Sequence, residues 1–179
     1  SNSYSGATTV SAGTLELASL TGSAAGSASS VTVANGATLL LSQSDQVNNI
    51  ATVTLSGGTI ARGSGVSEVF GNLNLTAASF LDFGTGTAGT MTFGTYTPGS
   101  LLTINNFAGN TLVFGSDLST TITNASYFSF SSGISSTWDS GANTFTITAV
   151  PETSTYVAAL GLLALGALPL VRRKRAKVS

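Results

Sequence analysis

Apolar and polar residues alternate along several short stretches of this chain. In each of these stretches every second residue is apolar: Val31-Thr-Val33, Val53-Thr-Leu55, Leu73-Asn-Leu75 and Met91-Thr-Phe93. Successive side chains of a β-strand point to opposite faces, so the stretches predict strands with one apolar face and one face of threonine or asparagine. We therefore expect the body of the chain to be all-β.

The strands recur in units that consist of a short strand, a bend that usually contains glycine, and a second short strand. Three copies are Val10-Ser-Ala-Gly13-Thr-Leu15, Val33-Ala-Asn-Gly36-Ala-Thr-Leu39 and Leu55-Ser-Gly-Gly58-Thr-Ile60, and Leu75-Thr-Ala-Ala-Ser-Phe80 is a weaker fourth. The units begin roughly 20 residues apart, a period typical of solenoids. One coil cannot bury its apolar face, whereas stacked coils can. The pattern favours a parallel β-helix, and the alternative is a two-sheet antiparallel sandwich.

After about residue 79 the repeat loosens and aromatic residues dominate. These are Phe80, Phe83, Phe93, Tyr96, Phe107, Phe114, Tyr127, Phe128, Phe130, Trp138 and Phe145. We expect solenoid coils in residues 1–83 and an aromatic-rich β capping region in residues 84–149, because an open solenoid end exposes its core. A hairpin of Tyr127–Phe130 and Thr144–Ile147, joined through Trp138 and the turn Asp139–Asn143, is predicted to close that end. Core packing is the expected role of the aromatics, and the alternative is a platform for stacking sugar rings.

Residues 150–179 differ in composition from the rest of the chain. Val150-Pro151-Glu152 precede the apolar run Tyr156–Val171, and a basic stop of Arg172, Arg173, Lys174, Arg175 and Lys177 follows it. A helix that is apolar all round predicts a transmembrane segment over residues 154–171. Lysine and arginine resist crossing a bilayer, so the tail 172–179 is expected in the cytoplasm and the body outside it.

This C-terminal end resembles the PEP-CTERM sorting signal of Gram-negative bacteria, with its motif in residues 150–155. Pro151 and Glu152 match the first proline and the glutamate of that motif, whereas Thr153 stands where a second proline is usual. The resemblance implies an exosortase-type membrane protease-transpeptidase as partner. It also implies anchoring in the bacterial inner membrane, followed by transfer to the cell surface or the extracellular space.

The beginning of the chain carries a second resemblance. Asn2-Ser-Tyr4-Ser-Gly6-Ala-Thr8-Thr9-Val10-Ser-Ala-Gly13-Thr14-Leu15-Glu-Leu17 is similar to the autotransporter-associated β-strand repeat of secreted bacterial passenger domains. It departs from that repeat at Ser3 and Ala7, where threonine and glycine are usual. The resemblance implies a right-handed parallel β-helix that extends upstream of Ser1, and it implies no activity. We therefore expect this chain to be the C-terminal fragment of a longer protein.

Charged residues are few and unevenly placed. The chain has 6 basic and 7 acidic residues, and Arg62 is the one basic residue before position 172. The body is therefore weakly acidic. Since binding phosphates requires clustered lysine or arginine, we expect no nucleic-acid partner.

Residue types that common catalytic and metal sites require are missing. The chain has no histidine and no cysteine, and it lacks the Gly-Gly-x-Gly-x-Asp repeats of calcium-binding β-rolls. A glycosidase needs two facing carboxylates, but Asp45, Asp82 and Asp117 each lack a second acid within about ten residues, so only coil stacking could pair them. We expect no catalytic residue, cofactor or metal.

These observations predict a structural or adhesin-like protein at the cell surface or in the extracellular matrix, where extracellular polysaccharide is a possible partner. The alternative from another class is a larger polysaccharide-degrading β-helix enzyme. Its active site would lie upstream, and this chain would be its spacer and anchor.

Overall fold

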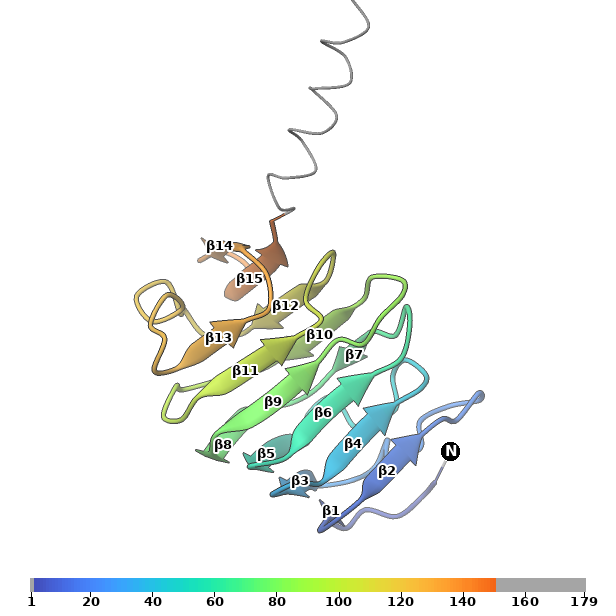
Figure 1. Cartoon of the computed structure of the whole chain (residues 1–179). Helices are drawn as coiled ribbons and strands as arrows, with labels where there is room; N and C mark the ends of the chain where they lie inside the picture. The colour runs from blue at the N-terminus through green and yellow to red at the C-terminus, as the bar shows by residue number, and fades with distance from the viewer. Residues whose placement is uncertain (1, 151–179) are drawn as a thin grey trace, which may run out of the picture.

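The computed structural model describes residues 2–150, which form an all-β parallel solenoid of about 6 turns without any helix (Figure 1). The front sheet has six strands: β2 (Thr14–Leu17), β4 (Thr38–Leu41), β6 (Thr59–Arg62), β9 (Ser79–Asp82), β11 (Leu102–Asn105) and β13 (Phe128–Phe130). The back sheet has four: β1 (Thr8–Val10), β3 (Ser30–Ala34), β5 (Thr52–Ser56) and β8 (Leu73–Ala77). The closing sheet has five: β7 (Glu68–Val69), β10 (Thr90–Phe93), β12 (Thr111–Phe114), β14 (Ile134–Asp139) and β15 (Thr144–Ala149).

The strand–bend–strand units form the corners between the back sheet and the front sheet. In the second unit, β3 and β4 are joined at Gly36, whose φ of 71° lies in the left-handed region that residues with a Cβ rarely adopt. Burial alternates along both strands, with Val31, Val33, Leu39 and Leu41 buried and the residues between them only partly covered. The apolar face predicted from the alternation is therefore the inner face of the coil.

Equivalent inward side chains of successive coils stack on one another. Val33 pairs with Leu55 in the back sheet, and Leu39 pairs with Ile60 in the front sheet, both in parallel register. Parallel pairing of strands from successive units confirms the predicted solenoid. The antiparallel sandwich is wrong for the repeat units. Among the described strands, the antiparallel pairs are β12–β15 and β14–β15, which lie after these units in the sequence.

The solenoid does not stop at residue 83, where the repeat becomes hard to read in the sequence. The strand pairs β9–β11, β11–β13 and β10–β12 are all parallel and continue the coils as far as Phe130. The predicted hairpin is therefore wrong in its first strand, because β13 pairs with β11 in the front sheet. β15 instead pairs antiparallel with β12 on one side and with β14 on the other, and the turn between β14 and β15 contains the predicted residues 140–143.

A β-bulge changes the register of the fourth unit. Leu55 pairs with Leu75, but Ser56 pairs with Ala77, so Thr76 is an extra residue in β8. The sequence pattern placed Phe80 at the core position of Ile60, whereas in the structure Leu81 pairs with Ile60 and Phe80 pairs with Thr59. A one-residue shift moves a side chain to the other face of a strand. As a result, Phe80 points outward and Leu81 is buried.

Most of the other aromatic residues are in the core, as expected. The fully buried aromatics are Phe70, Phe83, Phe93, Tyr96, Phe107, Phe114 and Phe145. They stack along the solenoid axis: the ring centroids of Phe70 and Phe93 lie 4.8 Å apart, and those of Phe93 and Phe114 lie 5.8 Å apart. The aromatics predicted to cap the solenoid therefore mainly fill its last coils.

Candidate functional site

The predicted sorting signal lies almost entirely outside the described residues. Val150 follows β15 directly, is 43% exposed, and donates its backbone N–H to the carbonyl oxygen of Gly133 at 2.8 Å. The other residues of the predicted signal are outside the described part of the chain: Pro151, Glu152, Arg172, Arg173, Lys174, Arg175 and Lys177. Within residues 2–150 the structure contains no helix with the length and apolarity of a membrane span.

Coil stacking brings two acidic residues close together at the corner after the front sheet. The buried Glu68 carboxylate accepts the backbone N–H groups of Gln46 at 2.8 Å and Val47 at 2.9 Å. Burial raises the pKa of Glu68 to about 7, the two hydrogen bonds lower it, and the charge of Asp45 raises it further. Among the described residues, Glu68 is thus a carboxyl group whose pKa is raised by the charge of a second acid, the feature to compare with the carboxylate pair of a glycosidase.

This pair is arranged as a structural link between coils. Both carboxylate oxygens of Glu68 are occupied by backbone amides, and its side chain is 1% exposed. The buried Gln46 extends the link: its Oε1 accepts the N–H of Ser19 at 2.8 Å, and its Nε2 donates to the Ser19 carbonyl at 3.2 Å. A general acid must reach a substrate oxygen, and Glu68 instead faces the inside of the coil.

The Arg62 side chain forms a second internal link. Arg62 is 3% exposed and donates hydrogen bonds to the carbonyl oxygens of Gly63 at 2.8 Å and Thr87 at 3.4 Å, and to Oδ1 of Asn110. Its guanidinium carbon lies 5.4 Å from the ring centroid of Phe83, a cation–π distance. Burial lowers the pKa of Arg62 from its ordinary value. One buried cation thereby joins three successive coils.

Asn110 and Gly89 complete the surroundings of Arg62. Oδ1 of Asn110 also accepts the N–H of Gly89 at 3.0 Å, and its Nδ2 donates to the carbonyls of Asn106 and Ala108. A Cβ at Gly89 would collide with the carbonyl oxygen of Val66, so glycine is required at this close approach. The oxygens around Arg62 are carbonyls, and within the described residues no cluster of acids could hold a metal ion.

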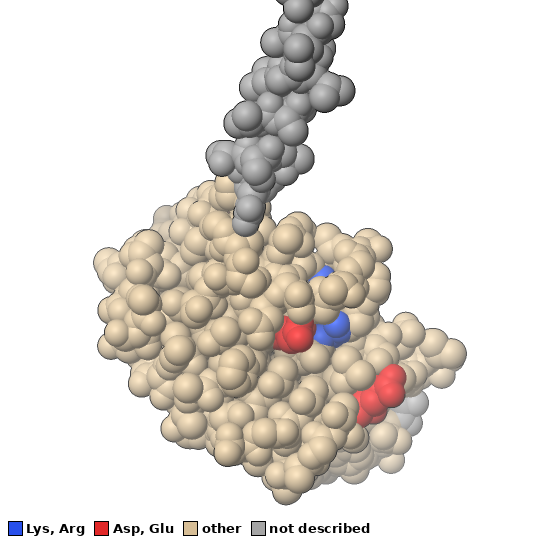
Figure 2. Space-filling view, in the orientation of Figure 1, with Lys and Arg blue, Asp and Glu red and all other residues tan. Residues whose placement is uncertain are grey.

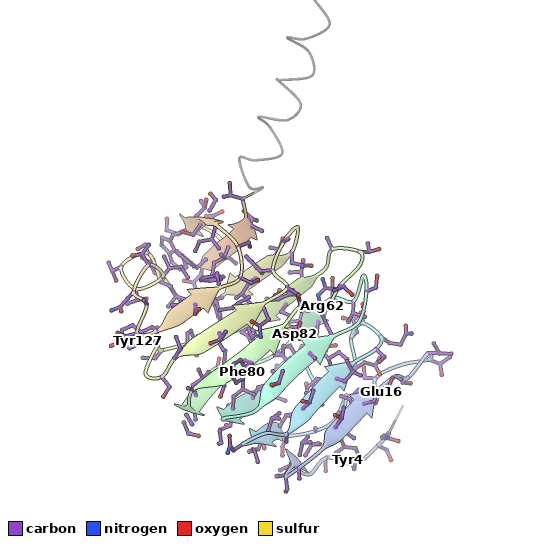
Figure 3. The ribbon with its side chains drawn as sticks, in the orientation of Figure 1. Tyr4, Glu16, Arg62, Phe80, Asp82 and Tyr127 are labelled. Atoms are coloured by element: carbon purple, nitrogen blue, oxygen red, sulfur yellow. The ribbon has the colours of Figure 1, made fainter. Side chains whose placement is uncertain are left out.

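The outer face of the front sheet presents two parallel rows of side chains (Figure 3). The threonine row contains one outward residue from each strand in register: Thr14, Thr38, Thr59, Phe80, Thr103 and Ser129. The neighbouring row contains Glu16, Leu40, Ala61, Asp82 and Asn105. Phe80, 39% exposed, is the single aromatic residue in either row.

A cavity with both polar and apolar lining adjoins the end of β9. It has a volume of about 280 Å³ and is lined by Gly84, Thr85, Gly86, Asn106, Ala108 and Asn110. Oδ1 of Asp82 accepts the N–H of Gly84 and the Nδ2 of Asn106, both at 2.8 Å. Asp82 therefore holds both loops that line the cavity. It is also a member of the outward row that neighbours the threonine row.

A second cavity of about 330 Å³ lies at the corner of the first two coils. Its lining residues are Ser19, Leu20, Gly22, Ser23, Gln43, Ser44 and Asp45. Leu20 is 82% exposed there, and the backbone of Asp45 has a φ of 55°. This cavity lacks an aromatic lining residue.

The sequence did not predict that Arg62 and Glu68 are buried. It also placed Phe80 on the inner face of its strand, whereas the side chain lies on the outer face. The contacting residues are separated by one or two coil lengths, so no local motif contains them. Gln46 and Glu68 would share a column if the sequence were written in rows of one coil each, and that alignment is the signal that could have found the link.

Comparison of the chain with protein-family models, with curated proteins and with solved structures gives no match. The assignment of a function therefore rests on the chemistry and geometry of this chain alone.

Proposed function

We propose that this chain is an exported structural or adhesin-like protein of the cell surface or extracellular matrix, and that it has no enzymatic activity. The observation that carries the proposal is the use of its buried polar groups. Hydrogen bonds between neighbouring coils are made by the buried side chains of Glu68, Gln46 and Arg62. Hydroxyl-bearing side chains instead lie on the outer face of the front sheet. Such a molecule presents a long hydrogen-bonding surface. A right-handed winding, implied by the resemblance of residues 2–17, belongs to the same proposal.

Sorting through the C-terminal signal is the second part of this proposal. The motif begins at Val150, immediately after the last strand of the closing sheet. Proline disfavours helical backbone at the residue before it, so Pro151 favours an extended connection between the solenoid and the predicted membrane segment. In the proposed sequence of events, an inner-membrane helix over residues 154–171 holds the exported body. An exosortase-type enzyme then cleaves near Pro151-Glu152 and transfers the body to the surface.

Mass spectrometry of the surface-associated protein tests the sorting step. We expect its C-terminus to lie near Val150–Glu152, without the basic residues 172–177. Glu152→Ala should reduce the processed fraction, and Thr153→Pro, which supplies the second proline of the motif, should increase it. Thr155→Ala is a matched control next to the motif. Recovery of surface protein that retains residues 172–177 would contradict processing.

The alternative is that the chain is the spacer and anchor of a larger polysaccharide-degrading enzyme. The observation that favours it is that β1 and β2 are edge strands of their sheets, so a preceding coil could pair with them. Under the leading proposal the purified chain should cleave no glycan, with or without calcium. Reproducible cleavage that is lost in Asp45→Asn, Asp82→Asn or Asp117→Asn would overturn it.

A further inference from the structure

We infer that the front sheet carries a binding site for a neutral polysaccharide, in which Phe80 stacks on a sugar ring while Asp82 and the adjoining cavity bind sugar hydroxyls. This inference rests on the proposed function, because it names the class of matrix component that the surface protein would hold. It concerns one face of the solenoid and is independent of how the C-terminus is processed.

The outward orientation of Phe80 is the first step of the argument. The extra residue Thr76 in β8 shifts the register, so that Phe80 takes the outward position held by Thr59 in the preceding coil. Bulges of this kind are common where a protein redirects a side chain toward a site. In a chain whose fully buried aromatics fill the core, this bulge exposes one aromatic ring on an otherwise hydroxyl-rich row.

The immediate neighbours of Phe80 suit a sugar ring. Thr59 and Thr103 flank it in the threonine row, and Ala61 and Leu40 lie in the neighbouring row of the preceding coils. Neighbouring strands are about 4.8 Å apart, so hydroxyl groups and apolar surface alternate over the dimensions of a single sugar. A pyranose has the same division, with C–H groups on its faces and hydroxyls around its edge.

Asp82 and the cavity extend the site along β9. Oδ1 of Asp82 is held by Gly84 and Asn106, while its Oδ2 accepts no hydrogen bond from any described residue. Phe80 and Asp82 lie two residues apart on the same face of β9, roughly 7 Å along the strand, and Gly84 follows in the loop that Asp82 holds. A chain of sugar units could therefore contact Phe80, Asp82 and the cavity at once.

The charges on this face decide between neutral and acidic polysaccharides. Glu16 and Asp82 are the carboxylates of the two rows, and the nearby cation, Arg62, is buried and committed to carbonyl groups. Figure 2 shows few charged side chains on this face. An acidic polymer would meet carboxylates without free cations to compensate them, whereas a neutral polymer would find acceptors for its hydroxyl groups.

The test measures co-sedimentation of the purified full-length chain with insoluble cellulose and mannan, and affinity electrophoresis in dextran, xylan and alginate. We expect retention by at least one of the four neutral polysaccharides that depends on Phe80. Alginate, which the basic residues 172–177 attract, should show no response that depends on Phe80. Phe80→Thr, which completes the threonine row, should weaken neutral binding about tenfold or more, and Phe80→Trp should retain it. Asp82→Asn, which keeps the bonding geometry of Oδ1, should weaken binding several-fold.

The matched control is Ile50→Thr, which removes an apolar side chain that is 83% exposed outside this site. It should bind like the parent protein, and all variants should show the parent's circular dichroism spectrum. Four results would overturn the inference: no retention by any neutral polysaccharide, alginate binding that is stronger and is lost in Phe80→Thr, unchanged neutral binding in Phe80→Thr, or equal loss in Ile50→Thr. Failure of the C-terminal processing experiment would leave this result unaffected, so the two proposals fail separately.

Discussion

The first and the last coils share one architecture but bury different side chains. In the aliphatic coils, residues 8–62, the larger buried apolar side chains include Val10, Leu17, Val31, Val33, Leu39, Leu41, Val53, Leu55 and Ile60. In the aromatic coils, residues 68–147, they include Phe70, Phe83, Phe93, Tyr96, Phe107, Phe114, Phe128 and Phe145. The backbone ladder is parallel in both up to β13. The coil path therefore depends on the alternation of apolar positions and accommodates side chains of different size.

Arg62 lies where the two kinds of coil meet. It belongs to β6, the last front strand of the aliphatic coils, and its guanidinium lies over the ring of Phe83 in the next coil. Its hydrogen bonds reach Thr87 and Asn110 in the aromatic coils. A long side chain that is apolar along its stem and polar at its end can join the two core compositions.

The largest expected effect is the loss of a stacked ring. Phe93→Ala should lower the free energy of unfolding by about 4 kcal/mol, because it leaves a cavity and removes contacts with both Phe70 and Phe114. The matched change in the aliphatic coils, Leu39→Ala, should cost about 3 kcal/mol. Denaturant unfolding measures the loss in the free energy of unfolding for each variant. Hydrogen exchange shows which coils lose protection. A larger loss for Leu39→Ala would contradict the assigned importance of the aromatic stack.

The next largest effect tests the junction between the coils. Arg62→Met keeps an apolar stem but leaves the carbonyl oxygen of Thr87 without the guanidinium, so it should cost about 2–3 kcal/mol. Amide exchange should accelerate at Gly89 and Asn110 more than at Val31 or Val33. Arg62→Lys retains the charge and should lose less. Uniform acceleration through the whole solenoid would show that Arg62 does not act locally.

The link between Glu68, at the start of the aromatic coils, and Gln46 in the aliphatic coils gives a pH dependence of intermediate size. The pKa of Glu68 is raised to about 7 in the folded protein from 4.5, so folding favours the protonated form. Its stabilising contribution is complete below pH 4.5 and is lost as the pH rises to 7. Solvent screening leaves an effect on the order of 1–2 kcal/mol.

Unfolding midpoints measured between pH 4 and pH 8 check this dependence. Glu68→Gln, which resembles the protonated acid, should flatten the curve. Glu16→Gln, a change at an exposed carboxylate in the first coil, is the matched control and should keep the slope of the parent protein. An increase in stability from pH 5 to pH 7 that disappears in Glu68→Gln would show that the two backbone amides outweigh burial.

The smallest effect concerns a hydroxyl inside the aromatic coils. Tyr96 is 2% exposed, and its Oη has no hydrogen-bond partner within the described residues. Burial also raises its pKa to about 12. Tyr96→Phe should therefore stabilise the protein by about 1 kcal/mol while keeping the ring contacts with Phe114 and Phe128. Thermal unfolding measures the gain, and a loss of stability would reveal a partner for the hydroxyl.

The architecture could be predicted from sequence because it depends on local alternation. The alternation at Val31 and Val33 predicts the inward face, and its recurrence at Val53 and Leu55 predicts the repeat. The structure confirms that these two strands pair in parallel register. The aromatic coils were harder to recognise because Phe and Tyr replace the aliphatic residues and hide the similarity between copies. For this reason Phe128–Phe130 was assigned to the hairpin, although it is the last strand of the front sheet.

The contacts between coils could not be predicted in the same way. Arg62 and Asn110 are 48 residues apart, and Gln46 and Glu68 are 22 apart. Their pairing depends on coil lengths, which vary with loop residues and bulges. The bulge at Thr76 shows how strongly the predicted side-chain directions depend on coil length. One additional residue moves every following side chain of the unit to the opposite face of the strand.

The position of β15 determines how the solenoid would bear a mechanical load. This strand ends one residue before Val150 and lies between β12 and β14, with six residue pairs to β14 and four to β12. A pull on Val150 along the strand loads the hydrogen bonds on both sides of β15 in shear. Many bonds must then yield together, whereas an edge strand pulled sideways opens them one after another. The end of the chain nearest the predicted anchor is thus the end built to resist tension.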